Sequence, residues 1–158
     1  MRMRTLFLLL AISLIGLAGD WSQWRGPERN GISQETGLLK QWPAGGPKLL
    51  WQLTDIGDGY ATPAVVGSRL YVQCNRGMEN ESLQALSIED GKTVWTVRLG
   101  NVGNPDMQPS YPKARSTPTI DGDRMYALSS DGDLVSLETA TGKVVWRKSL
   151  RADFGGQP

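Results

Sequence analysis

Side chains that carry out most protein-catalysed chemistry are scarce in this chain. Its 158 residues contain no histidine and a single cysteine, Cys74. Without an imidazole there is no Ser-His-Asp triad, no Cys-His pair and no histidine metal ligand, and one thiolate is too few for a zinc site. The sequence therefore predicts no catalytic residue and no metal ligand, leaves cofactor-binding residues unknown, and makes an enzyme the less favoured class.

Carboxylates are the remaining candidates for chemistry, and most of them lie in segments with the composition of turns. Asp and Glu side chains in turns commonly accept hydrogen bonds from nearby backbone amides. We therefore interpret this group as turn-forming, and catalytic or calcium-binding carboxylates stay open as the alternative. The group comprises Glu89, Asp90, Asp121, Asp123, Asp131 and Asp133.

The elements that would position such residues can be read from an internal repeat. Residues 85–95 (ALSIEDGKTVW) return 51 positions later as residues 136–146 (SLETATGKVVW). Residues 62–71 (TPAVVGSRLY) return 55 positions later as residues 117–126 (TPTIDGDRMY). Repeats of this length are units that bury their apolar faces against their neighbours, as in solenoids and propellers.

The second copy predicts four short strands, at residues 116–120, 124–128, 134–138 and 143–148. These runs are rich in β-branched and aromatic residues, and Asp-Gly and Thr-Gly pairs between them favour tight hairpin turns. Four-stranded antiparallel sheets that stack radially are the blades of a β-propeller. The expected fold is all-β, a partial β-propeller of about two full blades and one partial blade.

Three tryptophans follow the same period. Trp51, Trp95 and Trp146 are 44 and 51 residues apart, so residues 49–51 predict the last strand of the partial blade. We divide the chain into a signal peptide, a leader rich in Trp, Gly and Pro, and a repeat region. The expected boundaries are residues 1–18, 19–48 and 49–158, with the partial blade ending near residue 53 and full blades at about 60–100 and 114–150.

The repeated phrase resembles the tryptophan-docking repeat of the PQQ-like (quinoprotein) β-propeller family, which includes exported BamB-like outer-membrane assembly propellers. This resemblance implies that each Trp is wedged between adjacent blades and that the Gly turn allows a close approach. Ser87, Asp90, Ser136 and Glu138 depart from the usual phrase as tolerable turn substitutions. The resemblance assigns the structural docking motif to Trp51, Trp95, Trp146, Ala85, Gly91, Lys92, Gly142 and Lys143.

The first 18 residues have the features of a secretory signal peptide. Arg2 and Arg4 precede an apolar run that is shorter than a membrane-spanning helix requires, and a small-x-small triplet follows it. We expect an exported protein, periplasmic or associated with the cell envelope, with no membrane span after cleavage; an uncleaved anchor is the alternative. The mature chain carries almost no net charge, which argues against nucleic-acid binding. Cys74 lies in a strand and is expected to be buried.

The residues after the signal peptide suffice for about three blades, whereas closed propellers use about four to eight. Either the chain is a fragment of a longer propeller, or it is a short form that closes by oligomerising. Its final residues, 153–158, look loop-like. In the leader, Trp21 and Trp24 are expected to pack against the propeller edge, with a sugar- or peptide-binding surface as the alternative.

The resemblance implies two functions. The favoured one is a non-enzymatic binding or scaffold module without a cofactor, whose partners are envelope proteins or further propeller blades. The alternative is part of a PQQ-dependent alcohol or sugar dehydrogenase. Such an enzyme would hold PQQ and calcium in the central channel, and the cofactor would perform the chemistry.

Overall fold

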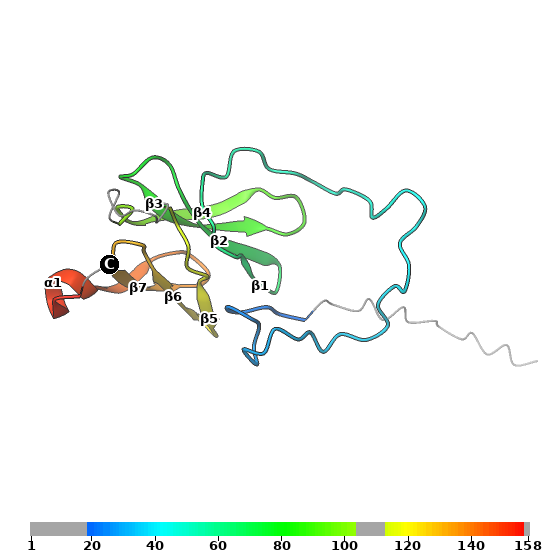
Figure 1. The fold of residues 1–158 in the computed structure, drawn as a ribbon, viewed down its shortest axis with the longest axis horizontal. Helices are drawn as coiled ribbons and strands as arrows, with labels where there is room; N and C mark the ends of the chain where they lie inside the picture. Colours follow the sequence, from blue (N-terminus) through cyan, green and yellow to red (C-terminus); the bar gives the residue numbers. More distant parts are fainter. Residues whose placement is uncertain (1–18, 104–112, 157–158) are drawn as a thin grey trace, which may run out of the picture.

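A computed structural model describes residues 19–103 and 113–156. These residues form two four-stranded sheets that pack against each other through their faces (Figure 1). The predicted signal peptide, residues 1–18, lies outside the described residues. The first sheet contains β1 (Ala64–Val66), β2 (Arg69–Asn75), β3 (Glu81–Ser87) and β4 (Thr93–Gly100); the second contains β5 (Thr119–Asp121), β6 (Arg124–Leu128), β7 (Asp133–Glu138) and β8 (Val144–Ser149), followed by the short helix α1 (Leu150–Phe154).

Each sheet is an antiparallel meander whose strands pair in chain order. In the first sheet, Ala85 lies between Tyr71 on β2 and Trp95 on β4. The second sheet repeats this register 55 and 51 residues later, including a register shift directly after the central residue. The predicted fold class is therefore confirmed: the chain is all-β, with two full four-stranded antiparallel blades of a partial propeller.

The hydrophobic core lies between the two sheets. Alternate residues of a strand point to the same face, so each sheet can direct one apolar set toward the other sheet. Because both sheets contribute to a single cluster, each buries the inner face of its neighbour. The cluster consists of Ala64, Tyr71, Leu83, Ala85 and Leu99 from the first sheet and Ile120, Met125, Ala127, Val135 and Leu137 from the second.

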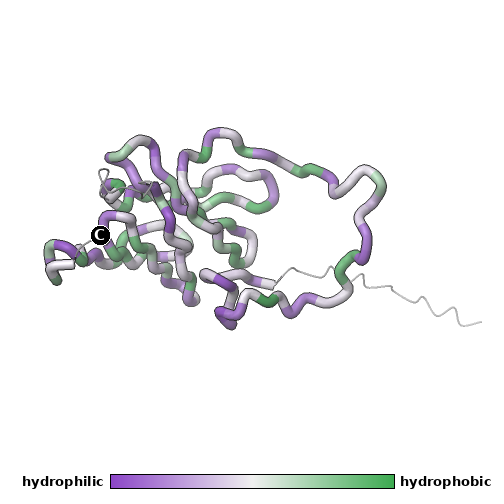
Figure 2. The backbone as a smooth tube through the Cα atoms, in the orientation of Figure 1, coloured by the Kyte–Doolittle hydropathy of each residue, from purple (hydrophilic) through white to green (hydrophobic). Residues whose placement is uncertain are grey.

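Between Trp21 and Asp58 the chain forms an arm that is attached to the first sheet at both ends. Trp21 and Val65 exchange backbone hydrogen bonds of 2.7 and 2.9 Å, and Asp58 and Asn75 exchange bonds of 2.9 and 2.8 Å. The arm loops away from the sheets (Figure 1), and apolar stretches recur along it (Figure 2). Its large exposed apolar residues are Trp24, Ile32, Leu38, Leu39, Trp42, Leu49, Leu50 and Leu53.

Two features of the arm differ from the sequence-based expectations. Trp21 is partly buried, but Trp24 is 61% exposed, so the expected packing of Trp24 was wrong. No strand is present at residues 49–53. A strand needs a paired neighbour, and within the described residues no segment forms a ladder with this one.

The last described residues form a helical turn where a loop was expected. The Ser149 hydroxyl caps α1 by accepting a hydrogen bond from the Ala152 amide at 3.1 Å. Gly155 ends the helix in the left-handed region, with φ of 68°. Serine and glycine are favoured at these two positions, but a five-residue helix is too short to produce a periodic apolar pattern. In the part of the chain that is described, no helix is long and apolar enough to cross a membrane.

Candidate functional site: tryptophan–glycine contacts at the sheet faces

The turns after β3 and β7 have the same backbone geometry. Gly91 and Gly142 both have φ of 72°, in the left-handed region that glycine adopts at little cost. The Gly91 amide donates to the Ser87 carbonyl and the Gly142 amide donates to the Glu138 carbonyl, both at 2.9 Å. Because its glycine has no side chain, each turn leaves room for a group to approach the backbone at this position.

Trp95 on β4 covers the second of these turns. A Cβ atom added to Gly142 would lie 2.7 Å from Cδ2 and Cε3 of the Trp95 ring. The Trp95 indole Nε1 donates a hydrogen bond to the Thr139 carbonyl at 3.3 Å, so the ring is fixed by both its face and its edge. Only glycine leaves room for this ring, and the contact joins the first sheet to the second.

Trp51, from the arm, covers the first turn in the same way. A Cβ atom added to Gly91 would lie 2.8 Å from Cε3 of the Trp51 ring. Its Nε1 donates to the Ile88 carbonyl at 2.8 Å. Ile88 precedes Gly91 by three residues, as Thr139 precedes Gly142. The ring therefore occupies the docking position without belonging to a strand.

Trp146 has no such turn against it among the described residues, and it is 41% exposed. Its ring lies 6.2 Å from Tyr126 at 45°, which reproduces the 5.9 Å and 42° between Tyr71 and Trp95. Tyr71 is buried by the second sheet, and this burial raises the pKa of its hydroxyl, an effect that nearby Arg69 partly opposes. The second sheet thus repeats the Tyr-Trp ring pair, but among the described residues no glycine turn covers its tryptophan.

The other assigned motif residues have local roles in the geometry. Ala85 is fully buried in the core between the sheets. Lys92 is exposed, and its Nζ lies 2.6 Å from the Asp90 carboxylate within the same turn. In the corresponding turn, the Lys143 amide donates to the Thr141 hydroxyl at 3.2 Å, where the Lys92 amide donates to the Asp90 carboxylate. Both lysines are therefore exposed on the outside of their turns.

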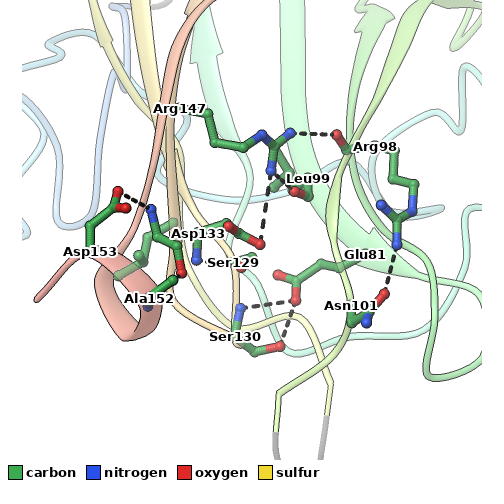
Figure 3. Close-up of polar contacts among 12 residues, drawn as sticks. Glu81, Arg98, Leu99, Asn101, Ser129, Ser130, Asp133, Arg147, Ala152 and Asp153 are labelled. Carbon is green, nitrogen blue, oxygen red and sulfur yellow. Dashed lines mark hydrogen bonds and ion pairs between the residues drawn. The ribbon is translucent and has the colours of Figure 1, made fainter. Parts of the chain in front are cut away.

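A buried polar contact also joins the sheets, and sequence reasoning missed it (Figure 3). Glu81, at the start of β3, is fully buried. Its carboxylate accepts hydrogen bonds from the Ser130 amide and hydroxyl at 2.9 and 2.5 Å, and from Gln73 Nε2 at 3.1 Å. The sequence offered one signal for this contact: Glu81 is a charged residue within a strand of a sheet expected to be covered on both faces. A carboxylate buried there requires polar partners.

Arg147 on β8 makes a second polar link between the sheets. Its guanidinium donates to the backbone carbonyls of Leu99 and, at 3.2 Å, Arg98 (Figure 3). It also lies 3.9 Å from the Asp133 carboxylate. In the same region Asp131 pairs with Arg151 at 2.5 Å. These two carboxylates are therefore engaged by arginines.

The described residues contain no cluster of metal-ligating side chains. Within residues 19–103 and 113–156, no group of three or more Asp, Glu, Cys or His side chains is placed to hold a metal ion. Cys74 is 2% exposed, lies 3.6 Å from the Ser82 hydroxyl and accepts a hydrogen bond from Gln84 at 2.9 Å. The thiol is thus enclosed between the first sheet and the arm at Gly57.

Removal of the Trp95 ring is expected to destabilise the protein far more than removal of Trp146. Trp95→Ala opens a gap over Gly142 and breaks the hydrogen bond to Thr139, so we expect a loss of about 3 kcal/mol in the free energy of unfolding. Trp146→Ala removes a ring with no covering turn and should cost less than about 1 kcal/mol. Denaturant unfolding of both variants measures the difference, and equal losses would show that the two rings have equivalent surroundings.

Asp90 provides a pH-dependent prediction. The Lys92 side chain and amide lower the pKa of the Asp90 carboxyl from its ordinary 3.8 to about 2. Because the folded-state pKa is the lower one, ionised Asp90 favours the fold above about pH 4, and this contribution is lost as the pH falls toward 2. An NMR titration of Lys92→Met should show the Asp90 pKa rising. Lys143→Met, in the turn that has Thr141 at this position, should leave it unchanged.

Most of this chain matches known proteins. Residues 31–158 match the family model described as outer membrane protein assembly factor BamB. The BamB protein of Salmonella typhimurium is 24% identical over 74 residues, which are 47% of this chain and 19% of that protein. The chain therefore spans about a fifth of the length of this relative.

Two solved structures show the same fold. The crystal structure of BamB from Moraxella catarrhalis matches with a TM-score of 0.50 and 24% identity, over 63% of this chain and 27% of that chain. Quinohemoprotein alcohol dehydrogenase from Comamonas testosteroni matches with a TM-score of 0.57 and 22% identity, over 85% and 20%. Identities this low establish the fold alone. Since the family model covers more than half of the sequence, the chain belongs to the family of the outer membrane protein assembly factor BamB.

Proposed function

We propose that the chain is an exported, non-enzymatic binding module of the cell envelope and that it binds through one face of the second sheet. This surface, called the open face below, consists of Tyr126, Leu128, Leu134 and Trp146. The register places these side chains together, because Leu128 lies opposite Leu134 and Ser136 lies between Tyr126 and Trp146. The open face is the surface on which the proposal rests.

Comparison with the first sheet supports this role. The positions equivalent to Tyr126, Leu128 and Leu134 are Tyr71, Gln73 and Leu83, which are 2%, 1% and 0% exposed. In the second sheet, Leu128 and Trp146 remain 36% and 41% exposed. Clustered exposed apolar side chains of this kind mark interaction surfaces. A surface that is buried in one copy of the repeat and exposed in the next is suited to a further sheet.

The repeat geometry also defines the chemistry of the partner. The partner should present a turn whose glycine can lie flat on the Trp146 ring. The backbone carbonyl of the residue three positions before that glycine should accept a hydrogen bond from the indole Nε1. Further propeller blades meet this description, as would an envelope protein with a similar turn. The name of the relatives, outer membrane protein assembly factor, makes proteins of outer-membrane assembly the first class to test.

The dehydrogenase alternative receives less support. The likeness to quinohemoprotein alcohol dehydrogenase concerns the fold, and fold does not determine function. Asp131 and Asp133 pair with arginines. The described residues contain no group of Asp, Glu, Cys or His side chains placed to hold a metal ion. We therefore assign this chain a binding role and derive no oxidation step.

Photocross-linking in intact cells tests the proposal. A benzoylphenylalanine at Leu128 should form a specific cross-link to an envelope protein or to further propeller blades, because this position lies on the open face. The same probe at Val94, which is 45% exposed on β4 but lies outside the open face, is the control. Trp146→Ala should reduce the Leu128 cross-link by about tenfold, the effect of losing about 1.4 kcal/mol of binding energy.

Two outcomes would contradict the proposal. A cross-link that is equally strong from Leu128 and Val94, or that is insensitive to Trp146→Ala, would place the binding surface elsewhere. Saturable quenching of tryptophan fluorescence by PQQ in the presence of calcium would favour the dehydrogenase alternative. The proposed export is measured separately, since the envelope form should begin near residue 19 by mass spectrometry.

A further inference from the structure

A cavity of about 640 Å³ lies between the two sheets, at the end where the first hairpin of each sheet turns. Its walls are the β1–β2 hairpin of the first sheet and, from the second sheet, the β5–β6 hairpin and the turn between β7 and β8. Cavities of this volume commonly hold small molecules. Every lining residue belongs to the two described sheets and their turns, so the cavity is a product of the contact between these sheets.

The first sheet contributes an arginine to this cavity. Arg69 is half-buried, and its Nη1 donates to the Ala140 carbonyl at 2.8 Å. Arg69 also contacts the Tyr71 hydroxyl, whose pKa is raised by burial, so this hydroxyl is neutral near pH 7. Within residues 19–103 and 113–156, Arg69 takes part in no ion pair. The positive charge of Arg69 is therefore balanced by none of the described carboxylates.

The second sheet shows the same position with a carboxylate present. Arg124 is the repeat equivalent of Arg69, and it is the other half-buried arginine of the described residues. Its Nη1 pairs with the carboxylate of the preceding residue, Asp123, at 3.0 Å. The residue before Arg69 is Ser68, which carries no charge. Because a cation that is partly removed from water is stabilised by a paired anion, an anion is the group that Arg69 lacks.

Other groups of the cavity restrict the kind of anion. The planar guanidinium has five donors that match the oxygens of a carboxylate, so Arg69 can bind one in addition to the Ala140 carbonyl. Glu138 lines the cavity from the second sheet, and its carboxylate accepts from the Thr141 hydroxyl at 2.8 Å. This negative charge disfavours phosphate and dicarboxylates. Val66 adds apolar surface to the opposite wall.

We propose that this cavity binds a small monocarboxylate with an apolar body, whose carboxylate is held by Arg69. Both the C-terminal residue of a peptide and a free aliphatic acid have this chemistry. The inference goes beyond the proposed function, because no residue of the open face lines the cavity. Its test uses the purified chain without any envelope partner, so the two proposals can fail separately.

An NMR titration of the purified chain with hexanoate tests the site. The backbone amides of Gly67 and Gly122, which line the cavity from the two sheets, should shift saturably with a midpoint at or below about 1 mM. Hexanamide has the same length without the charge and should bind at least about tenfold more weakly, because a charge-assisted hydrogen bond is lost. Adipate, with a carboxylate at both ends, should also bind at least about tenfold more weakly, because Glu138 repels the second charge.

Two substitutions assign the roles of the charged residues. Arg69→Gln should weaken hexanoate binding by at least about tenfold, since a neutral amide replaces the guanidinium. The matched control is Arg98→Gln, which should leave binding unchanged: Arg98 also donates to a backbone carbonyl and takes part in no described ion pair, but it is exposed and lies outside the cavity. Glu138→Gln should leave hexanoate binding unchanged and should strengthen the binding of adipate.

A peptide with a free C-terminus identifies the source of the carboxylate. Acetyl-leucyl-leucine should shift the same two glycine amides, and its C-terminal amide should bind at least about tenfold more weakly. Tighter binding of this peptide than of hexanoate would assign the site to a protein C-terminus. Tighter binding of hexanoate would assign it to a free acid.

Several results would overturn the proposal. One is the absence of a saturable shift with both hexanoate and acetyl-leucyl-leucine, and another is hexanamide binding as tightly as hexanoate. Full affinity in folded Arg69→Gln, checked by circular dichroism, would show that Arg69 does not hold the carboxylate. Should Arg69→Gln unfold, the comparison of hexanoate with hexanamide on the wild-type chain decides the role of the charge. Adipate binding as tightly as hexanoate would refute the restriction to monocarboxylates.

Discussion

The contact between an indole ring and a glycine turn is the constraint on which the arrangement of the sheets depends. A four-stranded meander has two faces, and neither can be left exposed without cost, so each sheet needs a neighbour. The ring of Trp95 reaches across to Gly142 at the outer edge, where the core of aliphatic residues ends. Because the ring needs a turn without a side chain, the position of one sheet is fixed relative to the next.

Polar contacts fix the remaining degrees of freedom between the sheets. Glu81 accepts hydrogen bonds from the amide and hydroxyl of Ser130, in the turn between β6 and β7. Arg69 donates to the Ala140 carbonyl, in the turn between β7 and β8, and Arg147 donates to carbonyls of β4. These bonds have directional requirements that the apolar core lacks. The core provides most of the driving force, while the hydrogen bonds select one relative placement of the two sheets.

Much of this fold could be predicted from the sequence because it repeats. The 51- and 55-residue offsets located the strands, and the repeated phrases contain the two glycines, Gly91 and Gly142, on which the Trp51 and Trp95 rings lie. The repeat could not show that residues 49–53 would remain unpaired, because strand formation depends on a neighbour and not only on local pattern. Nor could it show that Trp24 would be exposed or that Glu81 would be buried. Both depend on which segments meet in three dimensions, and neither residue belongs to the repeated phrases.

The buried carboxylate of Glu81 makes the two blades unequal. Its repeat equivalent is Gly132, which has no side chain and lies in the turn between β6 and β7. The Ser130 amide and hydroxyl that donate to Glu81 lie in the same turn. Replacing the first blade with a duplicate of the second would leave the half-buried Ser130 amide and hydroxyl without this carboxylate acceptor. The two blades are therefore not interchangeable, because only the first supplies the Glu81 carboxylate. Exchanging them would destabilise the protein even though their backbones have the same register.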